Sequence, residues 1–156
     1  MRRDFADYLF EELKVNKDLF LITGDLGFNL FNKHIETFPE RVLNPGSSEQ
    51  LIMGMATGLA LENKIPVVYS ITPFIIYRPF EFIRNYLDHE KIPVKIVGGG
   101  RDYDYGSEGF THHAPEDVKI LENFKNIELL KPSIFNRDLF NSFINSPNPA
   151  YLNLIR

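Results

Sequence analysis

Three groupings in the sequence have residue types suited to catalysis or ligand binding. The glycine run 98–100 could approach a phosphate closely, but its spacing is not the G-x-G-x-x-G of dinucleotide-binding loops. His112 and His113 are adjacent and therefore make poor co-ligands, and the chain has no H-E-x-x-H pattern, so we expect no metal site built by this chain alone. The serines beside acids at 47–49 and 107–108 lack the context of a hydrolase nucleophile. Taken alone, these groupings assign no reaction.

The composition narrows the classes of protein to which the chain can belong. Its 156 residues are 44% hydrophobic and 24% charged, which is typical of one folded domain over residues 1–156. A net charge of -4 provides no basic surface for nucleic acid, and the absence of cysteine excludes disulfides and thiolate chemistry. The first residues lack the apolar run of a signal peptide, and no apolar run approaches the ~18 residues of a membrane span. We therefore expect a cytoplasmic protein.

Segments with strand and helix patterns alternate along the chain. Short apolar runs predict strands at 19–23, 41–43, 66–71, 93–97, 127–130 and 150–155. Apolar residues at helical spacing predict helices at 3–15, from 28 to 38, from a capping box of Ser47 and Gln50 to 62, at 79–87, after Pro115 and around 139–144. An aromatic loop is expected between the third strand and residue 79. The alternation predicts an α/β fold, an open and mostly parallel sheet of about six strands with helices on both faces.

Four loops leave the carboxyl ends of the predicted strands, at 24–29, 44–49, 71–80 and 98–113. Ligands of open parallel sheets bind in the crevice beyond these ends. Because the four loops hold most of the acidic, aromatic and histidine residues suited to chemistry, we expect the functional site at this edge.

Motifs in these loops resemble, in the order of the chain, those of the transketolase family. Asn44–Gln50 is similar to the family's N-x-G-I-x-E-[QH] segment, and Asp25-Leu26 is similar to its A-D-L. The family's aromatic F-x-x-F-x-x-Y loop has its counterpart in three residues with the same spacing, Phe74, Tyr77 and Phe80. Residues 108–113 and 126–132 are similar to its D-G-x-T-H-Q and P-N-x-x-V-x-R-P segments. The chain thus resembles the family's pyrimidine-binding (Pyr) domain, a fold that binds thiamine diphosphate, over residues 2–135.

The sequence departs from the family pattern at several motif positions. Ser47 stands in place of the family's isoleucine, Glu108 in place of its aspartate, and His113 in place of its glutamine. No segment resembles the family's diphosphate-binding domain with its G-D-G…N metal motif, or its third domain. The resemblance therefore implies a separate diphosphate-binding subunit, which would also hold most ligands of a Mg²⁺ or Ca²⁺ ion.

The resemblance implies cofactor contacts for five residues. Glu49 corresponds to the catalytic glutamate whose carboxyl contacts N1′ of the aminopyrimidine and favours its imino tautomer, although by itself it could be a charge at a helix start. Phe74, Tyr77 and Phe80 would form the wall on which the pyrimidine stacks, although such spacing is also common in core packing. Asp25 would lie near the thiazolium ring or would cap the following turn.

The resemblance implies substrate contacts for four further residues. His112 corresponds to a catalytic histidine at the reacting carbonyl, where it can donate to a developing oxyanion, and Glu108 to the acid that reads a substrate hydroxyl. Arg2 and Lys131 correspond to arginines that bind a sugar phosphate, but lysine lacks the bidentate geometry of arginine. His112, Arg2 and Lys131 could instead be solvated residues with no substrate contact.

The resemblance also implies a function for the assembly. The chain would be the small subunit of a split transketolase, which transfers a two-carbon ketol unit between sugars or sugar phosphates in a heterotetramer that shares thiamine diphosphate with its partner subunit. Two alternatives remain, a β-type subunit of a 2-oxo-acid dehydrogenase or decarboxylase and a non-catalytic pyrimidine-type scaffold. The segment around His112 favours the transketolase, because it belongs to the sugar-handling branch of the family.

Overall fold

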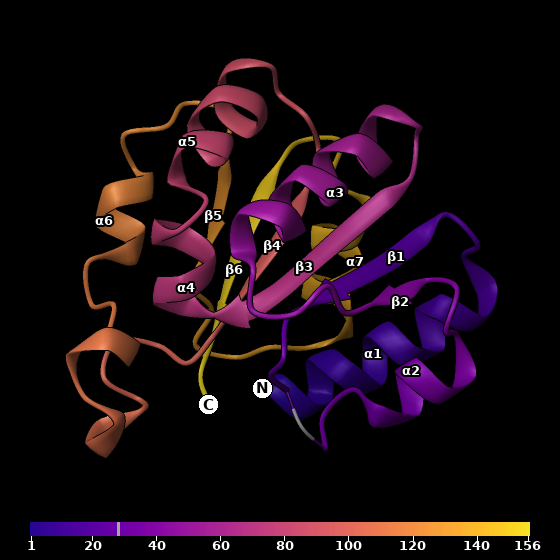
Figure 1. Ribbon diagram of the computed structural model, residues 1–156, viewed down its shortest axis with the longest axis horizontal. Helices are drawn as coiled ribbons and strands as arrows, with labels where there is room; N and C mark the ends of the chain where they lie inside the picture. The colour runs from indigo at the N-terminus through magenta and orange to yellow at the C-terminus, as the bar shows by residue number, and fades with distance from the viewer. Residues whose placement is uncertain (28) are drawn as a thin grey trace.

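The computed structural model describes residues 1–27 and 29–156, and its centre is a six-stranded sheet in the order β2-β1-β3-β4-β6-β5. Every neighbouring pair is parallel, as Figure 1 shows. The strands are β1 (Leu19–Thr23), β2 (Val42–Leu43), β3 (Ile65–Ile71), β4 (Lys95–Gly99), β5 (Glu128–Leu130) and β6 (Ala150–Leu154). The sheet confirms the predicted α/β class and the predicted number of strands.

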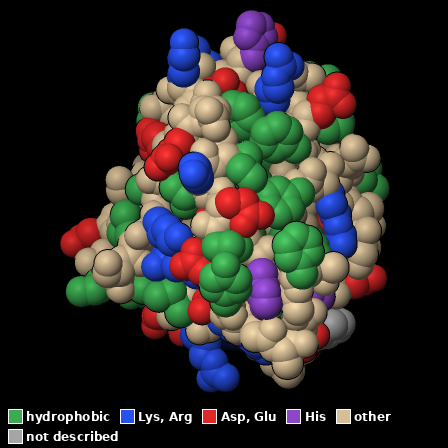
Figure 2. Space-filling model, turned by 90° about the vertical axis from the view of Figure 1, so that its left-hand side faces the viewer, with side chains coloured by type: hydrophobic (Ala, Val, Ile, Leu, Met, Phe, Trp, Pro, Cys, Tyr) green, Lys and Arg blue, Asp and Glu red, His purple; other side chains and the backbone are tan. Residues whose placement is uncertain are grey.

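Helices connect the strands and cover both faces of the sheet. They are α1 (Arg2–Val15), α2 (Asn32–Thr37), α3 (Glu49–Leu61), α4 (Thr72–Tyr77), α5 (Phe80–Phe82), the π-helix η1 (Ile83–His89), α6 (Asp117–Leu121) and α7 (Arg137–Asn145). Two 3₁₀ turns, η2 (Gly106–Glu108) and η3 (Phe110–His112), precede α6. On the face of the molecule that carries α6, basic side chains are interspersed with acidic ones (Figure 2). Within the described part of the chain, no helix is long and apolar enough to cross a membrane.

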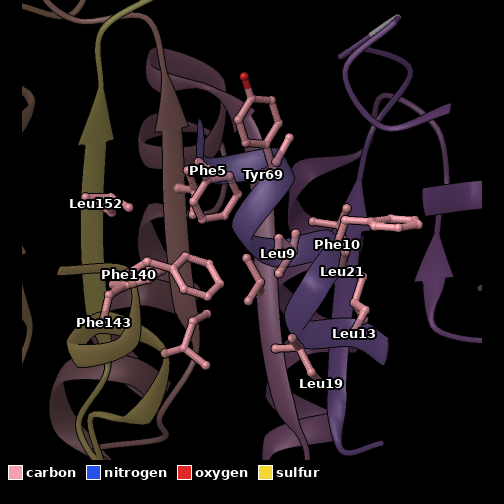
Figure 3. Close-up of a cluster of buried hydrophobic side chains, with 14 of the residues drawn as sticks. Phe5, Leu9, Phe10, Leu13, Leu19, Leu21, Tyr69, Phe140, Phe143 and Leu152 are labelled. Carbon is pink, nitrogen blue, oxygen red and sulfur yellow. The ribbon is translucent and has the colours of Figure 1, made fainter. Parts of the chain in front are cut away.

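The first face of the sheet is covered by α1 and α7. Their apolar residues, among them Phe5, Leu9 and Phe140, pack with Leu21 and Tyr69 of the strands into one buried cluster (Figure 3). Burying each such side chain contributes roughly 1.5–3 kcal/mol. The apolar residues whose helical spacing predicted helices at 3–15 and 139–144 are therefore the residues buried in this layer.

The opposite face is covered by α3, α4, η1 and α6. Ile52 and Met53 of α3 pack there with Ile22, Val68 and other residues of a second buried cluster. Consecutive strand residues such as Val67 and Val68 enter opposite clusters, because side chains alternate across a strand. The two helical layers pack on both faces of the sheet and so position the loops at its carboxyl edge. Both chain ends also lie at this edge (Figure 1).

Two local predictions are wrong. The capping box is absent, because Ser48 rather than Ser47 precedes α3 and its hydroxyl donates to the Pro45 carbonyl, 3.0 Å away. The expected aromatic loop is the helix α4, which begins directly after β3 with Pro73 in its first turn, where proline is favoured. Phe28, the first apolar residue of the predicted second helix, lies outside the described residues, and α2 covers the later part of that segment.

The glycine run has a packing role in this frame. A Cβ atom added to Gly98 would lie 2.7 Å from Thr72 Oγ1 and 2.8 Å from the Tyr151 hydroxyl oxygen, both too close for a real contact. Gly100 has a φ of +93°, a backbone conformation that favours glycine. These glycines therefore let β4 lie against α4 and β6.

Candidate active site

Glu49 is a buried carboxylate at the carboxyl edge of the sheet. It is the first residue of α3, and its side chain is 1% exposed. Ser70, near the end of β3, donates its hydroxyl to Glu49 Oε1 over 3.1 Å, and Arg78 donates Nη1 to Oε2 over 2.6 Å. A buried carboxylate requires such donors, because its desolvation is costly. Glu49 is thus a charged group held within the layer that α3 forms on the sheet.

Phe74 and His112 continue the site from Glu49. The Arg78 guanidinium carbon lies 3.9 Å from the centroid of the Phe74 ring. The centroid of the His112 ring lies 5.0 Å from that of Phe74, at an interplanar angle of 66°. The Thr111 hydroxyl lies 3.0 Å from His112 Nδ1. The structure therefore brings together three of the sequence-predicted residues, Glu49, Phe74 and His112, with Arg78 between the first two.

Tyr77 and Phe80 make their contacts with the following layer. The Tyr77 hydroxyl donates to Glu116 Oε1 over 2.8 Å, and the Phe80 ring packs on Phe124 at 5.4 Å between centroids. Burial, followed by the hydrogen bond to Glu116, raises the pKa of Tyr77 above its usual value. These contacts link α4 and α5 to α6 and its following turn, which favours a packing role for both aromatic residues.

Asp25 joins the loop after β1 to the turn that precedes Glu49. It is exposed, and its Oδ1 accepts a hydrogen bond of 3.0 Å from Asn44 Nδ2. Asn44 Oδ1 in turn accepts from the Gly46 amide over 3.0 Å. Asp25 therefore contributes to the placement of Glu49, whatever further contact it makes with a ligand.

The four predicted substrate residues lie in different surroundings. Lys131 forms an ion pair of 2.8 Å with Asp102, and Glu108 is exposed in η2. Arg2 lines a hollow of about 490 Å³ together with Arg156 and residues near the start of the chain. Arg2 Nε is buried and has no hydrogen-bond partner among the described residues, so this atom is closed to solvent. Arg2 thus lines a hollow beside a second arginine, whereas Lys131 is already paired.

Sequence reasoning missed Arg78 and Ser70. Ser70 could have been found, because it follows Val68 by two residues on the same face of β3 and therefore points toward α3. The contact of Arg78 with Phe74, four residues earlier along α4, is a local one, but its pairing with Glu49 carried no local signal, since it is set by how α3 and α4 pack. The ion pair with Glu49 spans 29 positions of the sequence.

Asp117, the first residue of α6, is a second buried carboxylate. It is fully buried and accepts hydrogen bonds from the Tyr151 hydroxyl at 2.5 Å, from the Val118 amide at 2.6 Å and from Asn153 Nδ2. Burial, and then the Asp117 charge, raise the pKa of Tyr151 well above its usual value. The hydrogen bonds of Asp117 thus connect α6 to β6, and α6 also contacts α4.

Metal ligands are not clustered in the described part of the chain. Among residues 1–27 and 29–156, no group of three or more His, Asp or Glu side chains could hold a metal ion.

The fold places the chain among the open, parallel α/β domains. The model of the family described as "Transketolase, pyrimidine binding domain" matches residues 1–152. The chain therefore belongs to the transketolase family, as a pyrimidine-binding domain.

Several relatives are proteins or chains of about twice this length. The chain is 34% identical over 122 residues, 77% of its length and 39% of the relative, to an apulose-4-phosphate transketolase subunit of Actinobacillus succinogenes. It is 30% identical over 159 residues to the putative transketolase C-terminal section of Methanocaldococcus jannaschii, covering 100% of this chain and 50% of the relative. A solved structure described as a split gene transketolase, inactive beta4 tetramer, superposes with a TM-score of 0.85 and 28% identity over 99% of this chain and 50% of that chain. The chain thus spans 39% to 50% of the length of these proteins.

Proposed function

We propose that this chain is the pyrimidine-binding part of a split, thiamine diphosphate-dependent transketolase that transfers a two-carbon ketol unit between sugars. The buried Glu49 carboxylate and the Phe74 ring, which both contact Arg78, carry the proposal, because an aminopyrimidine requires one carboxyl and one aromatic face. When bound, thiamine diphosphate supplies the carbanion chemistry that amino-acid side chains lack. Glu49 would hold a proton at N1′ of the pyrimidine, and Phe74 would pack on the ring.

His112 supports ketol transfer over the alternative 2-oxo-acid chemistry. Its ring packs on Phe74 and lies 5.6 Å from Tyr105 between centroids, at the mouth of the same site. From there an imidazole N–H can donate to the oxygen of a reacting carbonyl, where charge develops. A sugar hydroxyl next to that carbonyl would be in reach of the same loop, which carries the exposed Glu108.

The substrate of this reaction is proposed to be an anionic sugar. The names of two relatives mention apulose-4-phosphate and 6-deoxy-6-sulfo-D-fructose, a phosphorylated and a sulfonated sugar. Arg2, which lines the hollow of about 490 Å³ together with Arg156, would bind the anionic group there. Lys131 is already paired with Asp102 and would contribute less.

A second subunit is part of the proposal. The described residues hold no cluster of metal ligands, whereas a diphosphate group in proteins is commonly bound through a divalent ion. A partner subunit with the G-D-G…N motif would supply most ligands of that ion, Mg²⁺ or Ca²⁺. The cofactor would then lie between the two chains. We expect a heterotetramer of two copies of each.

The test is reconstitution followed by calorimetry with thiamine diphosphate and Mg²⁺. The chain alone should show no micromolar binding, and a mixture with the diphosphate-binding protein of the same genome should bind the cofactor and convert ketose donors. Micromolar binding by the chain alone would overturn the split site. Turnover of 2-oxo acids but not of ketoses by the mixture would establish the alternative reaction.

A further inference from the structure

Arg78 makes both of the contacts that the site offers to a planar, nitrogen-rich group. Its Nη1 donates to Glu49 Oε2 over 2.6 Å, and its guanidinium carbon lies 3.9 Å from the Phe74 ring centroid. A guanidinium resembles an aminopyrimidine in being flat, in donating N–H groups to a carboxylate and in packing on an aromatic face. The two groups therefore require the same partners.

We propose that Arg78 occupies the aminopyrimidine position in the free chain and is displaced from Glu49 and Phe74 when thiamine diphosphate binds. This inference rests on the proposed function, because it assigns the regulation of the same site. The Arg78 side chain thus competes with the cofactor for the same site, and the fraction of time that it occupies the site lowers the apparent affinity for the cofactor.

The different exposure of the two partners makes the exchange feasible. The Glu49 side chain is 1% exposed and cannot be hydrated without rearrangement, whereas the Arg78 side chain is 46% exposed. Without Arg78, the buried carboxylate would depend on the Ser70 hydroxyl as its side-chain donor among the described residues. The arginine can move into water at low cost, since guanidinium remains charged there and one side of it is already hydrated.

The position of Arg78 in the chain supports this movement. It directly follows α4, between Tyr77 and the buried Pro79, so its backbone is held on both sides while its long side chain remains free to change rotamer. Tyr77 is fixed by its hydrogen bond to Glu116. The backbone frame can therefore remain unchanged while only the arginine side chain leaves the site.

Fragment binding to the full chain tests the inference without the partner subunit. The probe is 4-amino-5-hydroxymethyl-2-methylpyrimidine, the pyrimidine half of thiamine, titrated by NMR into wild type, Arg78→Ala and the control Arg84→Ala. Arg84 is also exposed, but its hydrogen bond is to Asn85 and not to the site. An internal competitor lowers the apparent affinity, because only the fraction of the chain in which the site is free can bind the fragment. Arg78→Ala should therefore bind the fragment about fivefold to tenfold more tightly than wild type, and Arg84→Ala should bind it as wild type does.

Two further variants make the result specific to Glu49. Glu49→Gln in the Arg78→Ala background should abolish the gain, because the fragment then lacks its carboxylate. In thermal unfolding without ligand, Arg78→Ala should lower the melting temperature in the wild-type background and leave it nearly unchanged in the Glu49→Gln background. A gain in affinity that persists without Glu49, or additive effects of the two substitutions on melting, would overturn the inference.

The outcomes separate this inference from the proposed function. Equal or weaker fragment binding by Arg78→Ala, relative to wild type, would overturn the role of Arg78 alone. If no variant bound the fragment even at millimolar concentrations, this inference would be overturned, whereas the proposed function would still be decided by reconstitution with the partner subunit.

Discussion

Glu49 and Asp117 are both carboxylates with almost no exposure, but their partners differ in kind. Glu49 has one half-exposed arginine and one serine hydroxyl as side-chain donors. Asp117 has a buried tyrosine, a buried asparagine and a backbone amide, all fixed by β6 and α6. One carboxylate can exchange its main partner, and the other cannot.

This difference teaches how a functional carboxylate can be recognised. Burial by itself does not distinguish the two, since both are required to be hydrogen-bonded. A partially exposed partner can move into solvent and be replaced by a ligand. A set of buried, fixed donors cannot be replaced, and it indicates a structural role. Replacing the carboxyl by an amide at each position should therefore produce opposite phenotypes.

The largest effect is expected from Glu49→Gln on catalysis. In the reconstituted enzyme, kcat should fall by ~10² or more, because the amide cannot supply the proton at N1′, while thiamine diphosphate affinity stays within roughly tenfold. The melting temperature of the chain should change little, since Arg78 can turn to water. Steady-state kinetics, calorimetry and thermal unfolding measure the three quantities. Turnover near that of wild type would reduce Glu49 to a charge at a helix start.

Asp117→Asn should have the reverse effect, with its main loss in stability. The amide would place a donor against the Tyr151 hydroxyl or the Asn153 amide, so the free energy of unfolding should fall by about 2–3 kcal/mol. Denaturant titration of the full chain measures this, with Tyr151→Phe as a milder control that removes one donor. A stable Asp117→Asn variant with lost turnover would contradict the comparison.

The buried cation Lys95 extends the comparison to pH. Burial lowers its pKa to about 8 from 10.5, and Nζ donates to the carbonyls of Ser146 and Asn148. Above about pH 8 the unfolded chain binds more protons than the folded chain at this group, so stability should rise with pH, by about 1.5 kcal/mol between pH 8 and 9.5. Denaturant titrations across this range should show the rise in wild type and a flatter profile in Lys95→Met. A profile that is unchanged by the substitution would assign the rise to other groups.

Arg2 and Lys131 form a second contrast, between a cation that lines a hollow and one already held in an ion pair. Arg2→Ala should raise the KM for an anionic sugar by about tenfold, the cost of one charge-assisted hydrogen bond, and leave thiamine diphosphate affinity unchanged. Lys131→Ala should raise the same KM less, because Lys131 is already paired with Asp102. An unchanged KM in Arg2→Ala would identify Arg2 as a residue without substrate contact.

The smallest effect is expected from Tyr77→Phe. Loss of the hydrogen bond to Glu116 should lower the free energy of unfolding by about 1 kcal/mol, with cofactor affinity unchanged in the reconstituted enzyme. Denaturant titration and calorimetry measure the two quantities. A tenfold loss of affinity would instead place Tyr77 in the cofactor wall, beside Phe74.

Much of the fold could be predicted, because its signals are local. The spacing of Phe5, Leu9 and Leu13 marks α1, and short apolar runs mark all six strands. The errors are local as well. Ser47 was expected to cap α3, but the turn with Gly46 at a φ of +82° delivers Ser48 to that position instead. Motif resemblance added the family and singled out Glu49, Phe74 and His112, which the structure brings together.

The sequence by itself determined the order of the six strands and most of the helices between them, although it misplaced the start of α3 by one residue. Only the tertiary structure decided which partner each buried carboxylate has. Arg78 reaches Glu49 across 29 positions and Tyr151 reaches Asp117 across 34, through the packing of helices on the sheet. Local periodicity and capping patterns extend over a few residues, so they contain no information on such contacts. The exchangeable partner at Glu49 and the fixed partners at Asp117 arise when separate elements meet at one edge.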